Sequence, residues 1–219
     1  MPEARLAGRV VLVTGAGGAL GPCVVEACRA AGATVVGPRR EDVDLADLGA
    51  TQALAGRVAA EHGRVDCVLH LVGGYAGNGA IGEVTDADWT TLEARLLRTV
   101  LNVTRAFAGE LEASPYGRFV LVSTPQALAP KATGAVYATL KAAAETWTRA
   151  LADQFRENAS AATANIVAVQ AIVTPAMRAA KPDASFRTFT AAEDIAGALV
   201  FLCSDAARKM NGTRLPLHQ

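Results

Sequence analysis

The chain has 219 residues and a mass of 22.6 kDa, which at roughly 150 residues per domain predicts one large domain. Apolar residues make up 51% and charged residues 19%, so the chain can bury a large core and is not disordered. Lys plus Arg and Asp plus Glu both number 21, which excludes the basic excess typical of nucleic-acid and membrane-surface binders.

Short β-branched apolar runs alternate along the chain with longer helical patterns. The predicted strands are residues 9–14, 33–36, 65–72, 119–123, 165–171 and 213–217. The predicted helices are residues 20–31, 46–62, 86–112, 134–157 and 191–204. Asp86 and Thr190 are the expected N-caps of the third and fifth of these helices.

This alternation predicts an α/β fold in which residues 1–219 form a single domain. Right-handed crossovers then give a doubly wound parallel sheet of about seven strands, a Rossmann fold with helices on both faces. Such sheets bind ligands beyond the carboxyl ends of their strands. The loops that follow the strands are therefore the candidate site.

The loop after the first strand is rich in glycine and has the sequence TGAGGALG at residues 14–21. Glycines permit a tight turn and let backbone N–H groups approach a pyrophosphate, and the dipole of the next helix favours a negative charge. The spacing is not that of a P-loop, and an ordinary strand-to-helix turn is the alternative interpretation. The candidate cofactor contacts in this loop are Gly15, Gly17, Gly18, Leu20 and Gly21.

Residues 14–21 resemble the TGxxxGxG pattern of the short-chain dehydrogenases/reductases, with Ala19 in place of the middle glycine. Alanine is a mild change there if its φ angle is negative. The resemblance continues to the C-terminus and so covers nearly the whole chain. It implies an NAD(P)-dependent oxidoreductase.

The second loop bears on the choice of cofactor. An acidic residue after the second strand would hold the ribose 2′-hydroxyl of NAD, but this chain has Arg39 and Arg40 there. Two arginines suit a 2′-phosphate, so NADP(H) is favoured over NAD(H), with a solvated surface pair as the alternative. Asp44 and Leu45 resemble the Asp-hydrophobic pair that contacts adenine in the family.

The third loop departs from the NNAG motif that the family usually carries. Residues 70–73 are HLVG and are followed by Gly74. Gly73 and Gly74 still let the backbone pass close to a ribose, and His70 is interpreted as a structural replacement for the first asparagine. The stretch VGGYAGN at residues 72–78 resembles the corresponding loop of dihydropteridine reductases.

Tyr137 and Lys141 form a YxxxK motif on one face of a predicted helix. The lysine, with the positive nicotinamide ring, is expected to lower the pKa of the phenol. The resemblance implies that the tyrosine donates a proton to a carbonyl oxygen and that the lysine holds ribose hydroxyls. Thr124 matches the family's serine by spacing, with Ser123 beside it as an alternative, and a hydroxyl that only caps its own backbone remains a third interpretation.

The family's remaining catalytic residue, an asparagine, aligns with Leu96, which cannot hold a proton-relay water. An impaired nucleotide-binding scaffold, or pseudoenzyme, of the same fold is therefore the alternative function. Thr174 matches the threonine that bonds the nicotinamide carboxamide or phosphate. Residues near 175–190 are expected to form a short lid, whose apolar side chains either touch the substrate or only pack the lid.

The resemblance implies hydride transfer to or from a carbonyl, an imine or a quinonoid pterin-like substrate. It also implies a homodimer or homotetramer built on the two long helices. No metal or nucleic-acid partner is expected. No membrane partner is expected either, since no apolar run could span a bilayer and no signal peptide begins the chain. The four cysteines lack CxxC spacing, which predicts buried thiols in a reducing cytoplasm.

Overall fold

Six strands form the main sheet in this computed structural model, which describes residues 6–77 and 79–217. The spatial order is β2-β1-β3-β4-β5-β8, and every pairing is parallel. Because the chain moves outward from β1 to β2 and then returns to β3, the topological switch point lies between the carboxyl ends of β1 and β3. The strands are β1 (Val10–Thr14), β2 (Thr34–Val36), β3 (Cys67–His70), β4 (Arg118–Ser123), β5 (Thr163–Ala168) and β8 (Arg214–Pro216).

The main sheet has fewer strands than the roughly seven that the sequence predicts. Only residues 37–47 join β2 to the helix α2 (Leu48–His62). A parallel crossover needs a dozen or more residues before its next strand begins, so this connection has no room for a further helix and strand. The edge of the sheet is therefore β2.

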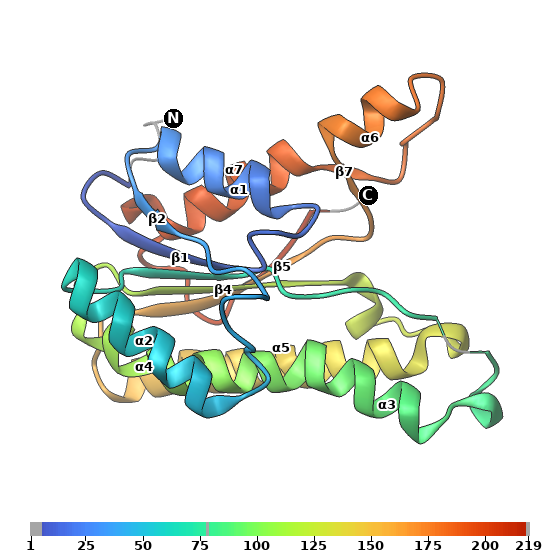
Figure 1. Cartoon of the computed structure of the whole chain (residues 1–219), viewed down its shortest axis with the longest axis horizontal. Helices are drawn as coiled ribbons and strands as arrows, with labels where there is room; N and C mark the ends of the chain where they lie inside the picture. Colours follow the sequence, from blue (N-terminus) through green and yellow to red (C-terminus); the bar gives the residue numbers. More distant parts are fainter. Residues whose placement is uncertain (1–5, 78, 218–219) are drawn as a thin grey trace.

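Helices cover both faces of the sheet, as expected (Figure 1). The helices α1 (Gly21–Ala30) and α7 (Ala192–Cys203) lie on one face, and α2, α4 (Thr99–Ala113) and α5 (Ala135–Glu157) lie on the other. Alternate residues of β1 bury against opposite helix layers, Leu12 on the α4 side and Val11 on the α1 side. Burial on both faces explains why the strands are nearly continuous apolar runs.

The segment 86–112, expected as one helix, is divided into three. It consists of α3 (Asp86–Glu93), a π-helical turn (Ala94–Arg98) and α4. The N-cap is Thr85 rather than Asp86, because the Thr85 hydroxyl accepts the Asp88 N–H (3.1 Å) and the Asp88 carboxylate accepts the Thr85 N–H (3.1 Å). Helices with such π turns often carry functional residues at the turn, which here contains Leu96.

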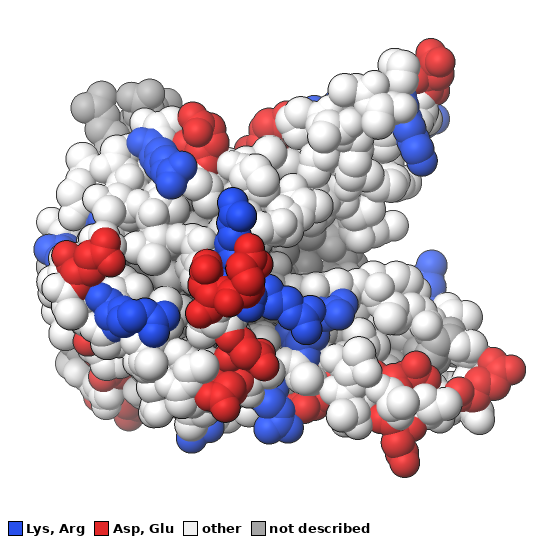
Figure 2. Space-filling model, in the orientation of Figure 1, with Lys and Arg blue, Asp and Glu red and all other residues white. Residues whose placement is uncertain are grey.

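A small second sheet pairs β6 (Ile172–Val173) with β7 (Thr190–Ala191) and brackets the helix α6 (Pro175–Ala180). Thr190 lies in β7, so the N-cap of α7 is Ala191 and not Thr190. Figure 2 shows the surface hollowed between the segment that carries α6 and the part that carries α3, with mostly uncharged walls. Short 3-10 helices occupy Ile81–Glu83, Pro125–Ala127, Ala132–Gly134 and Asp205–Ala207.

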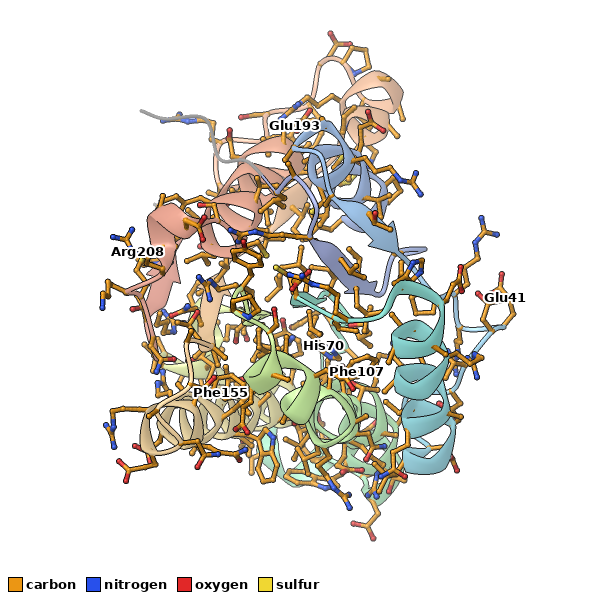
Figure 3. The ribbon with its side chains drawn as sticks, turned by 90° about the vertical axis from the view of Figure 1, so that its left-hand side faces the viewer. Glu41, His70, Phe107, Phe155, Glu193 and Arg208 are labelled. Atoms are coloured by element: carbon orange, nitrogen blue, oxygen red, sulfur yellow. The ribbon has the colours of Figure 1, made fainter. Side chains whose placement is uncertain are left out.

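The interior combines a large apolar core with buried polar and charged side chains. Figure 3 shows His70, Phe107 and Phe155 inside the molecule, while Glu41 and Arg208 lie at its periphery. No helix in the described part of the chain is both long and apolar enough to cross a lipid bilayer. Asn78, within the expected loop 72–78, lies outside the described residues.

Candidate active site

The glycine-rich loop after β1 is packed closely against backbone atoms at two glycines, within the loop at Gly21 and against the segment after β3 at Gly15. A Cβ on Gly21 would lie 2.0 Å from the carbonyl oxygen of Ala16, and a Cβ on Gly15 would lie 3.0 Å from the backbone nitrogen of Val72. Gly15 also has a φ of +82°, a conformation that other residues rarely adopt. By contrast, a Cβ on Gly17 would meet no atom within 4 Å. The loop is therefore closed toward the protein and open on the side where a ligand would approach.

The helix α1 begins directly after this loop without a side-chain cap. Its N-cap residue, Leu20, makes no side-chain hydrogen bond, so the first backbone N–H groups are not capped by a side chain. Ala19 keeps a negative φ, because Ala159 is the only non-glycine with positive φ among the described residues. The alanine in place of the family's middle glycine is therefore tolerated. The arrangement fits the pyrophosphate of a dinucleotide.

Arg39 and Arg40 are exposed in the loop that follows β2. The guanidinium of Arg39 lies 3.7 Å from the Glu41 carboxylate, and the two side chains are 71% and 68% exposed, so this pair is weak. Both arginines are accessible to a phosphate group from solvent. Asp44 is exposed and its carboxylate accepts a backbone N–H two residues on (3.0 Å), while Leu45 is half-buried.

The two glycines after β3 have different neighbours. A Cβ on Gly73 would lie 3.8 Å from the Nζ atom of Lys141, so this glycine borders the candidate catalytic lysine. A Cβ on Gly74, whose φ is +148°, would lie 2.8 Å from the guanidinium of Arg95. Gly74 thus lets the loop pass close to a charged side chain, whereas a Cβ on Gly73 would make only an ordinary contact.

His70 is fully buried at the end of β3. Its Nδ1 atom is 2.9 Å from the Thr14 hydroxyl and its Nε2 atom is 3.3 Å from the Thr99 hydroxyl. Burial, together with the nearby charge of Lys141, lowers the pKa of His70 to about 3. A neutral imidazole that joins β1 to α4 in this way agrees with a structural role.

Tyr137 and Lys141 lie one turn apart on α5, beside the carboxyl end of β4. The phenol of Tyr137 lies close enough to the hydroxyl of Thr124 for that hydroxyl to lower its pKa. The ammonium of Lys141 is buried and donates to the carbonyl oxygen of Val122 (3.0 Å). The four-residue spacing of Tyr137 and Lys141 therefore places the phenol and the ammonium together beside the carboxyl end of β4.

The two neighbouring hydroxyls at the carboxyl end of β4 have different partners. Ser123 donates to the carboxylate of Glu145 (2.7 Å), inside the protein. The hydroxyl of Thr124 accepts the N–H of Gln126 (3.3 Å) and lies near the phenol of Tyr137. The Thr124 hydroxyl thus has two roles. It caps its own backbone, as one interpretation of the sequence expected, and it also lies beside the tyrosine.

The pKa of Tyr137 is shifted upward, opposite to the expected effect of the lysine. Burial of the phenol raises its pKa, and the nearby hydroxyl of Thr124 only partly offsets this effect. Burial also lowers the pKa of Lys141 to about 8, with Glu145 opposing that shift. As the pH rises, the Lys141 ammonium therefore loses its proton before the Tyr137 phenol does. The lysine is then uncharged in the pH range in which the phenol ionises, so it does not lower the pKa of Tyr137.

Leu96 occupies the position where the resemblance expects an asparagine. It is fully buried in an apolar cluster with Leu92, Val136 and Leu140, against which Tyr137 packs. Sequence patterns did not identify Tyr75, whose ring centroid is 5.2 Å from that of Tyr137 in an edge-on contact. Tyr75 is 62% exposed, and an aromatic residue inside a glycine-rich loop was the signal that could have identified it.

Thr174 lies at the base of the expected lid. Its hydroxyl accepts the N–H of Met177 (3.2 Å) and so caps α6. Phe186 and Phe189 contact each other edge-on with centroids 5.4 Å apart. Among residues 6–77 and 79–217, no group of three or more His, Cys, Asp or Glu side chains could hold a metal ion.

The chain is similar to known proteins over nearly its whole length. A family model described as enoyl-(acyl carrier protein) reductase matches residues 4–218. L-xylulose reductase of Bos taurus is 28% identical over 249 residues, which cover 98% of this chain and 97% of that protein. The 3-oxoacyl-(acyl-carrier-protein) reductase FabG of Escherichia coli is 25% identical over 235 residues, which cover 95% of each chain.

Solved structures share the fold. A short-chain type dehydrogenase/reductase from Mycobacterium ulcerans matches with a TM-score of 0.86 and 25% identity, over 97% of this chain and 89% of that one. A short chain dehydrogenase from Burkholderia cenocepacia J2315, solved in complex with NADP, matches with a TM-score of 0.84 and 24% identity over 98% of both chains. At that identity the second match establishes the fold alone.

Proposed function

Because this chain belongs to the short-chain dehydrogenase/reductase family of NAD(P)-dependent oxidoreductases, we propose that it transfers hydride between NADP(H) and a carbonyl, imine or quinonoid pterin-like substrate. The observation that carries this proposal is the closeness of the Tyr137 phenol to the Thr124 hydroxyl, with Lys141 one turn along the same helix. A proton donor, a second hydroxyl and a cation are the groups that carbonyl reduction needs. The similar proteins do not support the pterin over the other substrate classes.

The nicotinamide would supply the hydride, and residues at the carboxyl edge of the sheet would hold the rest of the cofactor. Within residues 15–21, the N–H groups of Gly18 and Gly21 donate to carbonyl oxygens of the loop, and backbone N–H groups of the other residues would bind the pyrophosphate. Arg39 and Arg40 would bind the 2′-phosphate, and Asp44 with Leu45 would contact the adenine. The remaining contacts would come from Gly73, Gly74, Tyr137, Lys141 and Thr174.

In the reduction direction, Tyr137 would donate its proton to the substrate oxygen while that oxygen also accepts a hydrogen bond from Thr124. The raised pKa of Tyr137 keeps the phenol protonated near neutral pH, as an acid requires. Lys141 would hold the ribose hydroxyls close to the phenol. The segment 175–190 would close over the substrate as a lid.

Arg39→Asp is expected to weaken NADPH binding about 10- to 100-fold and NADH binding far less, because a charged hydrogen bond to phosphate is worth about 1.5–3 kcal/mol. Fluorescence titration of both cofactors measures the change. Arg57→Asp, an exposed arginine on α2, is the matched control and should change neither affinity. Equal losses for the two cofactors, or a wild type that prefers NADH, would contradict the assignment.

NADPH affinity is expected to fall as the pH rises through about 8, where buried Lys141 loses its charge. The ammonium is present below that pH, so binding is strong there and weakens above it. A titration of NADPH affinity against pH gives the midpoint. Lys141→Met should remove this midpoint, whereas Lys131→Met, which alters an exposed lysine, should retain it. An affinity in the wild type that does not change through pH 8 would argue against the ribose contact.

A pseudoenzyme of the same fold would bind NADPH without oxidising it. Leu96, Thr124 and the altered loop at residues 70–73 favour this alternative, whereas the intact Tyr137 and Lys141 oppose it. Oxidation of NADPH in the presence of ketones, imines, quinones and quinonoid pterins separates the two functions.

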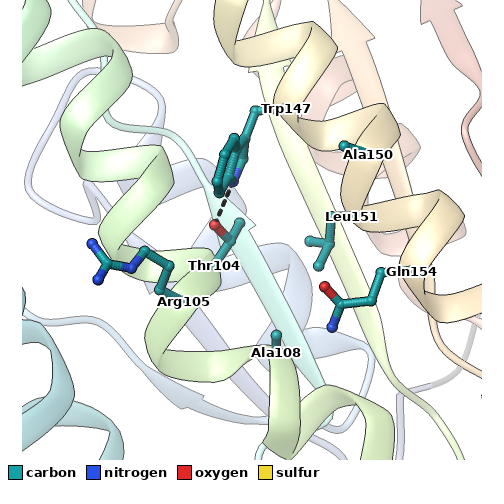
Figure 4. Close-up of a pocket in the computed structure, with 7 residues that line it drawn as sticks. All are labelled: Thr104, Arg105, Ala108, Trp147, Ala150, Leu151 and Gln154. Carbon is teal, nitrogen blue, oxygen red and sulfur yellow. Dashed lines mark hydrogen bonds between the residues drawn. The ribbon is translucent and has the colours of Figure 1, made fainter. Parts of the chain in front are cut away.

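A homo-oligomer would pack the faces of α4 and α5 together. These helices border a cavity of about 160 Å³ beside Trp147, whose indole N–H donates to the Thr104 hydroxyl (2.8 Å, Figure 4). Trp147 is 39% exposed, whereas a large aromatic side chain in a protein core is mostly buried. Sedimentation of the purified chain would distinguish a monomer from a dimer or tetramer.

A further inference from the structure

A buried carboxylate on α5 lies two turns beyond Tyr137 and one turn beyond Lys141. This residue, Glu145, is 1% exposed. It accepts hydrogen bonds from Ser123 (2.7 Å) and from the guanidinium of Arg214 on β8 (3.0 and 3.2 Å). Its four-residue spacing from Lys141 puts both charges on one face of the helix.

Arg214 also contacts the residue that carries the substrate-side hydroxyl. One of its nitrogens donates to the backbone carbonyl of Thr124 (2.9 Å), while its Nε atom bonds Glu145. A second arginine, Arg149, bonds Glu145 as well (3.0 Å), but its side chain is 42% exposed and it has no bond to Thr124 in the described structure. The two arginines therefore share a partner and differ in their link to the active site.

Buried ion pairs contribute little to stability, because the cost of removing two charges from water offsets their attraction. The pair of Glu145 and Arg214 is therefore poorly explained as a device for stability alone. We propose that Glu145 and Arg214 form a positioning pair, in which Arg214 fixes the backbone of Thr124 and Glu145 keeps Lys141 charged. This inference rests on the proposed function for its effect on turnover.

The electrostatic half of the proposal follows from the surroundings of Lys141. The titratable groups around its ammonium are Glu145 and Tyr137 on its own helix and His70 on β3. His70 is neutral and Tyr137 is protonated near pH 7, since burial lowers the pKa of the first and raises that of the second. Glu145 is thus the negative charge that opposes the effect of burial on the pKa of Lys141.

Two matched variants test the link to Thr124. Arg214→Gln and Arg149→Gln each remove one cation from Glu145, but only the first removes a bond to Thr124. Because small misplacements of a reacting group are costly, Arg214→Gln should lower kcat roughly 10- to 100-fold with little change in the KM for NADPH. Arg149→Gln should retain the wild-type kcat. Equal kcat values for the two variants would overturn this half of the proposal.

The charge effect is measured on the free protein, without cofactor or substrate. Lys141 is the buried lysine of this chain, since Lys131, Lys181 and Lys209 are exposed, so its NMR titration can be distinguished from theirs. Glu145→Gln, which keeps the shape and one of the two acceptor oxygens but removes the charge, should move the midpoint of Lys141 from about 8 to lower pH. An unchanged midpoint would overturn this half. If wild type oxidises no NADPH with any substrate while the midpoint still moves, the proposed function fails and the electrostatic inference stands.

Discussion

Tyr137→Phe is expected to lower turnover by about 10²–10⁴-fold, a larger loss than we expect from any other substitution in the site. The ring and its contacts with Tyr75 and the apolar cluster around Leu96 remain, so the fold and NADPH binding should stay near wild type. What is lost is the proton that the phenol would give to the substrate oxygen. Steady-state oxidation of NADPH against pH measures the loss.

Tyr116→Phe is the matched control for this variant. Tyr116 lies away from the candidate site, with the guanidinium of Arg9 over its ring at 4.3 Å, so removing its hydroxyl should leave turnover unchanged. A Tyr137→Phe variant with wild-type kcat/KM across the pH range would assign the proton to solvent or to another residue. That result would contradict the role of Tyr137 without excluding hydride transfer.

Gly21→Ala is expected to disrupt the phosphate loop, because the added methyl group would lie 2.0 Å from the carbonyl oxygen of Ala16. The neighbour is backbone and cannot simply rotate away, so the loop itself must move. Overpacking of this kind costs about 1–3 kcal/mol of unfolding free energy. NADPH affinity should fall at least roughly tenfold, because the N–H groups that would face the pyrophosphate are displaced.

Two other glycines provide the comparison for Gly21→Ala. Gly56 lies within α2, and an added Cβ there would meet no atom within 4 Å, so Gly56→Ala should stabilise the fold by about 1 kcal/mol and leave NADPH binding unchanged. Gly17→Ala should leave the free protein intact and weaken NADPH binding only, because Gly17 faces open space. Equal NADPH affinity for Gly21→Ala and Gly56→Ala would count against the loop as a phosphate site.

Local patterns predicted most of the fold. The apolar runs of β1 and β4 and the helices α1 and α5 lie within a few residues of their expected positions. The YxxxK spacing brought Tyr137 and Lys141 together because helical geometry alone decides that contact. The glycine-rich loop was recognised for a similar reason, since a strand, a turn and a helix follow one another within residues 10–30.

Features that depend on long-range contacts were not predictable in the same way. The main sheet has six strands, one fewer than the roughly seven expected, because the connection 37–47 is too short to hold a further helix and strand. That consequence appears only when the sheet is assembled. The partner of Glu145 is Arg214, which lies 69 residues further along the chain. The helical spacing of Glu145 from Lys141 was a signal for the first of these two residues, but no local pattern identifies the second.

The pKa of Tyr137 shows why motif chemistry alone was insufficient. The motif predicts that a lysine one turn away, together with the positive nicotinamide ring, lowers the pKa of the phenol. In the folded chain both groups are buried, and burial raises the pKa of Tyr137 while it lowers that of Lys141. The direction of the shift is therefore set by burial, which depends on the packing around the site.

Hydride transfer by this chain is most directly tested with NADPH that carries deuterium at the transferred position of nicotinamide C4. The wild-type protein is incubated with ketones, imines, quinones and quinonoid pterins, and each product is analysed for deuterium. We expect at least one substrate to be reduced with one deuterium per oxidised NADPH, and Tyr137→Phe to slow this transfer. Tight binding of NADPH with no oxidation by any of these substrates would contradict a hydride-transfer function.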